Sequence, residues 1–171
     1  MELEYFILFL PLLAAFISGF LGKFIGHRSS EIITSLFTSV SAILSVLVFY
    51  KVMDQSYENN IIISTWLNSG SLYVNWSIKI DALSSVMLVV VTLISALVHI
   101  YSIGYMSHDP HRSRFMAYLS LFTFSMLTLV TSDNFLQLFF GWEGVGLSSY
   151  LLIGFWYKNP TANAAAIKAF I

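Results

Sequence analysis

The sequence contains no cysteine, which excludes disulfide bonds, thiol catalysis and cysteine-ligated zinc or iron–sulfur clusters from these 171 residues. Charge is scarce as well, because Asp, Glu, Lys and Arg make up 10% of the residues, against roughly 25% in an ordinary soluble domain. The net charge of −1 offers no basic surface for nucleic acid. With 57% hydrophobic residues, the composition indicates an integral membrane protein that contacts a lipid bilayer.

Long apolar runs with at most one charged residue divide the sequence, and the complete ones are close to the length that an α-helix needs to cross a bilayer, roughly 20 residues at about 1.5 Å per residue. They predict an all-α membrane protein with five complete transmembrane helices and the start of a sixth. The runs are Tyr5–Gly22, Ile32–Tyr50, Ala82–Ser107, Phe115–Ser132, Asn134–Tyr157 and Thr161 onward. Apolar residues continue to Ile171 without a stop signal, so we expect an N-terminal fragment of a longer protein.

The second run is rich in hydroxyl side chains, which let helices approach closely inside a bundle. We therefore predict that this helix packs in the interior. Its hydroxyl residues are Thr34, Ser35, Thr38, Ser39, Ser41 and Ser45.

The basic residues predict the orientation of the chain. Acidic Glu2 and Glu4 precede the first run, a polarity opposite to that of a signal peptide, so we expect a retained helix. Successive helices cross the bilayer in opposite directions, so the basic residues fall into two groups on its two sides. The larger group is Lys23, Arg28, Arg112, Arg114 and Lys158, and the smaller group is Lys51 and Lys79. The positive-inside rule then places the N-terminus outside.

A polar stretch between the second and third helices predicts a β-hairpin. Segments Ile61–Leu67 and Ser71–Ile80 flank the turn sequence Asn-Ser-Gly at 68–70, and the second segment alternates apolar and polar residues. We expect this hairpin to lie outside the bilayer and cap the outer helix ends. The chain divides at this point into 1–81, with two helices and the hairpin, and 82–171, with the third helix and those after it.

Glu143 is the only charged residue between Asn134 and Tyr157. A carboxylate at that membrane depth costs about 2.5–3.5 kcal/mol on insertion scales, so such groups are rare and usually face a bundle interior or an ion pathway. We predict that Glu143 transfers protons; the alternative is a structural hydrogen bond across helices. Helical spacing places small and aromatic residues around it; those predicted to pack there are Gly141, Gly144, Gly146, Ser148 and Tyr150.

Two further titratable residues are candidate relays for protons. His99 lies toward the inner end of the third run, where it either relays a proton or satisfies a local hydrogen bond. Lys168 lies about 10 Å into the sixth helix, where it either joins the relay or extends back to the interface.

The loop between the third and fourth helices contains a conceivable metal-binding set, His108, Asp109 and His111. Its spacing fits no common zinc pattern, and Pro110 marks a turn. A solvated loop on the inner side is therefore the favoured interpretation, and we predict no metal or cofactor site in this chain.

Three segments resemble one family closely: Asp133–Tyr157, which surrounds Glu143 with Phe-Phe-Gly-Trp-Glu-Gly-Val-Gly, and the shorter His99–Met106 and Arg114–Tyr118. They are similar to the antiporter-like subunits of respiratory complex I (NADH:quinone oxidoreductase), represented by bacterial subunit L and mitochondrial subunit 5. The resemblance implies an antiporter-like helix bundle that translocates protons. Glu143 takes the position of the family's helix-five glutamate, whose lysine partner lies on a broken helix seven, beyond Ile171.

The same resemblance implies the partners and the location. NADH, FMN, iron–sulfur clusters and quinone would be bound by other subunits, and other membrane-arm subunits would contact this one. The bacterial inner membrane is the expected location, with the mitochondrial inner membrane as the alternative. Two other functions stay open: the large subunit of an Mrp-type sodium/proton antiporter, which shares the glutamate, and a non-catalytic membrane scaffold.

Overall fold

The fold is known from a computed structural model, which describes residues 3–55, 58–70 and 72–171. Two residues of the sequence analysis, Glu2 before the first helix and Ser71 at the start of the second strand, lie outside the described residues. The elements in chain order are α1 (Leu3–Phe20), α2 (Gly22–Ile25), α3 (His27–Gln55), β1 (Asn59–Ser69), β2 (Leu72–Ile80), α4 (Ala82–Tyr105), α5 (Arg112–Val130), α6 (Phe135–Ile153) and α7 (Pro160–Phe170).

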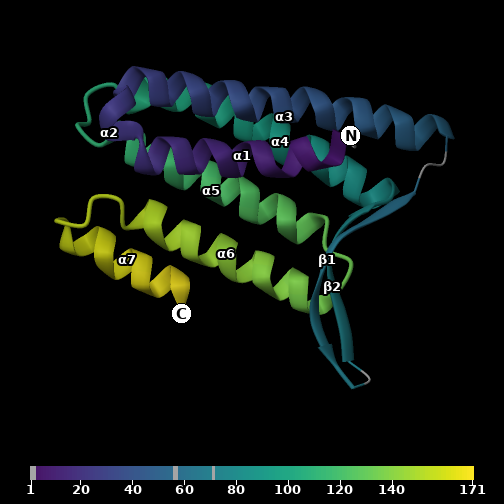
Figure 1. Cartoon of the computed structure of the whole chain (residues 1–171). Helices are drawn as coiled ribbons and strands as arrows, with labels where there is room; N and C mark the ends of the chain where they lie inside the picture. Colours follow the sequence, from purple (N-terminus) through teal and green to yellow (C-terminus); the bar gives the residue numbers. More distant parts are fainter. Residues whose placement is uncertain (1–2, 56–57, 71) are drawn as a thin grey trace.

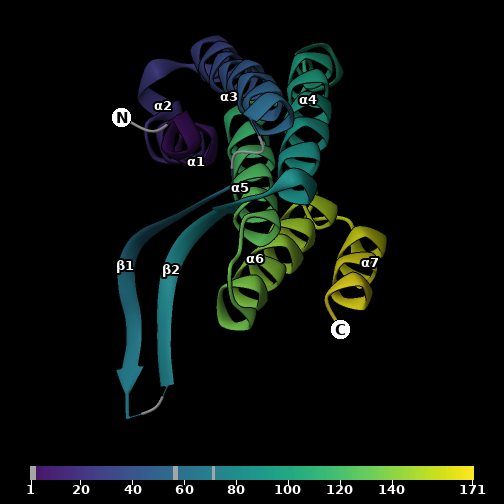
Figure 2. The same ribbon diagram turned by 90° about the vertical axis from the view of Figure 1, so that its right-hand side faces the viewer.

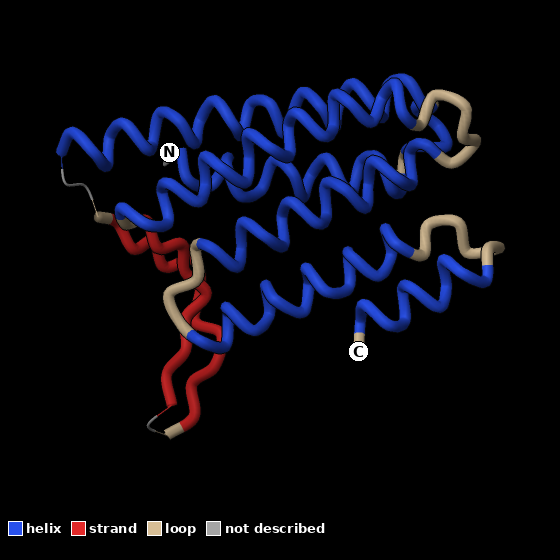
Figure 3. The backbone as a smooth tube through the Cα atoms, turned by 180° about the vertical axis from the view of Figure 1, so that it is seen from behind, coloured by secondary structure: helices blue, strands red, loops and turns tan. Residues whose placement is uncertain are grey.

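The long helices run side by side, with α5 at the centre (Figures 1 and 2). Helices α1, α3 and α4 pack against one side of α5, and α6 packs against the other. Helix α7 turns back along α6 (Figure 3). The α4–α5 and α6–α7 connections lie at one end of the bundle together with α2, and the hairpin lies at the opposite end (Figure 1). The basic connections therefore share one end, as the predicted orientation requires.

By length and composition, four of the described helices can cross a membrane: Leu3–Phe20, His27–Asp54, Ala82–Tyr105 and Arg112–Val130. This confirms a helical membrane protein. Helix α6 lies alongside α5 but is not among these four, so the count of five complete spans stays a prediction.

The bundle has the polarity expected in a bilayer. Large apolar side chains such as Phe20, Phe24 and Leu83 cover its outer surface. Hydroxyl side chains fill much of its interior, including those of α3 at Thr34, Ser35, Thr38, Ser41 and Ser45. The hydroxyl face of α3 is therefore interior, but the helix as a whole is not, because Ile32, Ile43 and Tyr50 on its other face are exposed.

Local sequence signals define where several helices begin. Asp81 caps α4, and its carboxylate accepts a hydrogen bond from the Ser84 amide at 2.7 Å; this bond lowers the pKa of Asp81. Asn134 caps α6, and α7 begins with Pro160 in its first turn. Helix α3 starts at His27, ahead of the predicted Ile32, because hydropathy alone cannot show that the preceding polar turn stays helical.

The predicted hairpin is confirmed: β1 and β2 pair antiparallel around a turn in which Gly70 adopts a positive φ of 59°. Its inner half contributes Ile61, Ile78 and Ile80 to the apolar core at this end of the bundle. That core also includes Ile7, Leu8, Val48, Val52, Leu88 and Leu127. The outer half of the hairpin extends past the bundle and is mostly exposed (Figure 1).

The free edge of β2 is hydrogen-bonded to the α5–α6 connection. Gln137 of α6 accepts a hydrogen bond from the Ser77 amide at 3.0 Å and donates one to the Ser77 carbonyl at 2.7 Å, as the backbone of a third strand would. On either side, the side-chain Nδ2 of Asn134 donates to the Asn75 carbonyl, and the backbone amide of Lys79 donates to the Thr131 carbonyl. These bonds satisfy backbone groups that an unpaired edge would leave open.

We predict that Gln137→Leu loosens the hairpin, because two buried backbone groups of Ser77 lose their partner. The cost should be about 1–3 kcal/mol, typical of buried unsatisfied groups. Hydrogen exchange at the Ser77 amide in the full-length protein measures the change, and the rate should rise. Thr65→Val is the control, since the Thr65 hydroxyl bonds to the Tyr73 hydroxyl in the exposed outer half; equal exchange at Ser77 in both variants would contradict the docking role.

Candidate functional site

Glu143 lies at mid-length on α6, and its side chain is exposed. The side of α6 that faces α5 carries the buried residues Gln137, Gly141 and Ser148. With about 3.6 residues per turn, Glu143 projects from the other side of the helix. Among the described residues it forms no hydrogen bond or ion pair.

The glycines near Glu143 serve two different surfaces. A Cβ at Gly141 would lie 2.7 Å from the Leu129 backbone, and one at Gly144 would lie 2.8 Å from the Ser125 hydroxyl, so both glycines allow α5 to approach. Ser148 is buried on the same side and donates to the Gly144 carbonyl. A Cβ at Gly146, by contrast, meets nothing within 4 Å in the described chain, so this position leaves open space.

Helix α7 packs on the side of α6 that carries Glu143. Gly154 approaches the Cβ of Ala166, and the ring of Tyr150 lies 5.6 Å from that of Phe170. Tyr150 is two turns from Glu143 on one face, about 10 Å along the helix axis. The face that presents the carboxylate is therefore already partly covered by the next helix of the chain.

Lys168 is not brought to Glu143. It lies on α7, two residues from Ala166, and this spacing places it on the opposite side of α7 from α6. Its side chain is exposed and forms no ion pair among the described residues.

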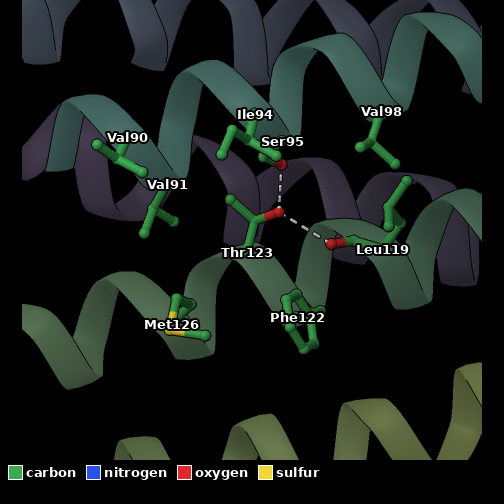
Figure 4. A pocket seen from close by; sticks show the side chains of 9 residues that line it. All are labelled: Val90, Val91, Ile94, Ser95, Val98, Leu119, Phe122, Thr123 and Met126. Carbon is green, nitrogen blue, oxygen red and sulfur yellow. Dashed lines mark hydrogen bonds between the residues drawn. The ribbon is translucent and has the colours of Figure 1, made fainter. Parts of the chain in front are cut away.

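His99 is fully buried between α4 and α5. Its Nδ1 lies 2.8 Å from the Ser95 carbonyl oxygen, and its Nε2 lies 3.0 Å from the Ser120 hydroxyl. The Ser95 and Thr123 hydroxyls meet at 2.5 Å across the same two helices (Figure 4). A cavity of about 260 Å³ with mainly apolar walls opens beside this bridge.

The structure does not unite His99 with Glu143, because α5 lies between them. His99 contacts α5 from α4, whereas Glu143 projects from the side of α6 that faces away from α5. A relay that used both residues would have to pass around or through α5.

One buried ion pair was absent from the sequence analysis. The Glu31 carboxylate on α3 lies 3.4 Å from the Arg112 guanidinium at the start of α5, and the Glu31 side chain is 3% exposed. The apolar run was predicted to begin at Ile32, which left Glu31 outside the predicted helix. Glu31 precedes Thr34 and Ser35 by three and four residues, and residues at this spacing share a helix face. That spacing was the signal from which the burial of Glu31 could have been predicted.

Of the loop residues considered for metal binding, Asp109 is engaged in hydrogen bonds. Asp109 accepts hydrogen bonds from the His111 amide and from the Trp156 indole at 3.0 Å. In the described parts of the chain, no group of three or more His, Asp or Glu side chains is arranged to hold a metal ion.

We predict that Gly141→Ala destabilises the α5–α6 contact, because its methyl group would overlap the Leu129 backbone. Overpacking of this kind costs about 1–3 kcal/mol. Thermal unfolding of the full-length protein in lipid measures the loss. Gly104→Ala is the matched control, since a Cβ there meets nothing within 4 Å in the described chain; a similar loss in both variants would refute the close approach.

We also predict that His99→Phe lowers stability by about 1 kcal/mol, the scale of polar contacts between membrane helices. The same unfolding measurement tests this. Ser102→Ala is the control, because the Ser102 hydroxyl donates to the Val98 carbonyl of its own helix. If both variants lose equally, the bridge to Ser120 contributes nothing. A His99→Gln variant that unfolds normally but loses proton pumping would instead identify a relay.

Comparisons with known proteins agree on one family. Residues 66–116 match the model for the N-terminus of NADH-ubiquinone oxidoreductase (complex I) chain 5, and residues 132–171 match the transmembrane model for NADH:quinone oxidoreductase and Mrp antiporters. The chain is 54% identical over 165 residues to NADH-ubiquinone oxidoreductase chain 5 of Phytophthora infestans, covering 96% of this chain and 25% of the relative. It is 51% identical to NADH-quinone oxidoreductase subunit L of Rhodobacter capsulatus, with 96% and 24% coverage.

The chain thus spans about a quarter of the length of these curated relatives. A solved structure, that of the membrane-bound sulfane sulfur reductase, an archaeal respiratory membrane complex, contains a chain with the same fold. The TM-score is 0.84 at 17% identity, over 99% of this chain and 33% of that one. By its sequence matches, the chain belongs to the family of complex I membrane subunits that includes chain 5 and subunit L.

Proposed function

We propose that this chain is part of a proton-translocating membrane-arm subunit of an NADH:quinone oxidoreductase, and that Glu143 binds and releases the translocated proton. The observation that carries the proposal is the position of Glu143. It is the only charged side chain of α6, and it projects from the face on which α7 packs. Protein, rather than lipid, is the natural cover for an acid on such a face.

The packing of α6 supports this role. Gly141 and Gly144 hold one side of the helix against α5, and Gln137 fixes its first turn to the hairpin. The direction of the Glu143 side chain is thus set by contacts on the far side of the helix. A cationic partner from another helix would stabilise the ionised carboxylate, and its withdrawal would favour protonation. Glu143 would alternate between these two states during turnover.

The remaining parts of the proposal concern the assembly. NADH, FMN, iron–sulfur clusters and quinone would be bound by other subunits, and the neighbouring membrane-arm subunits would be the partners of this one. Relatives occur in both bacteria and organisms with mitochondria, so the bacterial inner membrane and the mitochondrial inner membrane both fit.

The test is Glu143→Gln in the full-length subunit, assembled in its complex. We expect normal assembly and a loss of proton pumping of at least tenfold, because the amide keeps the shape of the side chain but cannot carry a proton; removal of a proton-transfer group typically costs about 10²–10⁴-fold. Quenching of a pH-sensitive dye in sealed vesicles measures pumping, and NADH oxidation is followed in parallel.

Glu58→Gln is the matched control, since Glu58 is exposed beside the hairpin, away from α6. Normal pumping by Glu143→Gln would favour a scaffold role and contradict the proposal.

The matched transmembrane family model also names Mrp antiporters, which makes sodium/proton exchange the second candidate. Sodium flux that stops in Glu143→Gln, without any dependence on NADH, would establish that function instead.

A further inference from the structure

The end of the bundle that carries α2 contains a cavity of about 340 Å³ whose ionisable lining residues are two histidines, a lysine and an arginine, with no acidic residue among them. Lys23 follows α1, His27 begins α3, His111 precedes α5, and Arg114 lies in the first turn of α5. The other lining residues are uncharged: Ser18, Gly19, Gly22, Pro110 and Ser113. Such a cavity attracts an anion.

The nearby acidic groups are already engaged. Glu31 pairs with Arg112, and Asp109 accepts hydrogen bonds from the His111 amide and the Trp156 indole. Arg114 donates to the Phe155 carbonyl at 3.1 Å, and its guanidinium lies over the Phe155 ring at 4.7 Å. Its Nε is buried and has no partner among the described residues. Arg114 therefore contributes its positive charge at the edge of the cavity, while its guanidinium is held against Phe155.

An apolar groove of about 290 Å³ continues from this cavity along α1 and α5. Gly19 lines both spaces, and the groove extends from Phe20 back to Leu12 on α1. That distance is about 12 Å along the helix axis, directed into the membrane span. Small residues line the groove where the two helices meet: Ala15 and Gly19 come from α1 and Ala117 from α5, and a Cβ at Gly19 would lie 3.5 Å from that of Ala117.

We propose that the basic cavity and the apolar groove together bind one phospholipid with an anionic headgroup. The phosphate lies among Lys23, His27, His111 and Arg114, and one acyl chain lies between α1 and α5. Charge selects the headgroup, since each basic side chain near a membrane surface favours anionic lipid by about fivefold. The groove selects a lipid over a free anion, because only a lipid fills both spaces.

The test uses the full-length subunit in its assembled complex, placed in vesicles of phosphatidylcholine with a minor fraction of phosphatidylglycerol. Each lipid is supplied in turn with a photoreactive group on its acyl chain, and crosslinks to α1 and α5 are mapped by mass spectrometry. We expect phosphatidylglycerol to label the groove several-fold more than phosphatidylcholine. Lys23→Gln should reduce this preference about fivefold. Gly19→Leu should reduce labelling by both lipids, because the larger side chain fills the groove.

Arg28→Gln is the matched control, since Arg28 lies at the same end of the bundle but does not line the cavity. Equal labelling by the two lipids overturns the proposal. An equal loss of the preference for phosphatidylglycerol in Lys23→Gln and Arg28→Gln also overturns it, because that result would indicate general electrostatic attraction at this end of the bundle. Displacement of the lipid by excess inorganic phosphate would overturn it in favour of a free-anion site. If Lys23→Gln fails to assemble, the lipid preference of the unmodified complex and the Gly19→Leu variant still decide.

Discussion

Within a bilayer, apolar side chains gain little by leaving lipid for another helix, so helices associate through close packing and hydrogen bonds. This constraint explains the composition of the bundle. Large apolar residues face outward, while hydroxyls and small residues lie between the helices. Helix α5 is the centre of this arrangement. Its Ser120 is hydrogen-bonded to His99 of α4, and its Ser125 packs closely against Gly144 of α6. Each contact depends on a short side chain.

The hairpin and α6 determine each other's positions. The Gln137 side chain completes the free edge of β2, and Gly141, one turn later, meets the Leu129 backbone. These contacts lie on one side of α6 and prevent the helix from rotating about its axis. The face that carries Glu143 is consequently fixed by residues that never touch it. Changes of proton occupancy would then rely on side-chain movement or on a partner, with the helix itself held in place.

Features encoded over short distances were predictable from the sequence. Hydropathy located the long helices, and alternation located the hairpin. Features that join distant segments were not. The Glu31–Arg112 pair connects α3 to α5, and nothing near Glu31 in the sequence identifies its partner. The glycines near Glu143 were expected to let another helix come close, and Gly141 and Gly144 do so for α5; the identity of that helix could not be predicted, because periodicity gives a face without its neighbour.

The central place of α5 has a consequence for biosynthesis. Ser18 of α1 donates a hydrogen bond to the Ser113 carbonyl, 95 positions later in the chain. A ribosome that has just delivered α1 to the translocon must synthesise α3, the hairpin and α4 before this acceptor exists. Until then α1 resides in the membrane with one of its packing surfaces covered by lipid or by an insertion factor. Nascent chains halted before α5 should therefore be good substrates for membrane quality-control proteases.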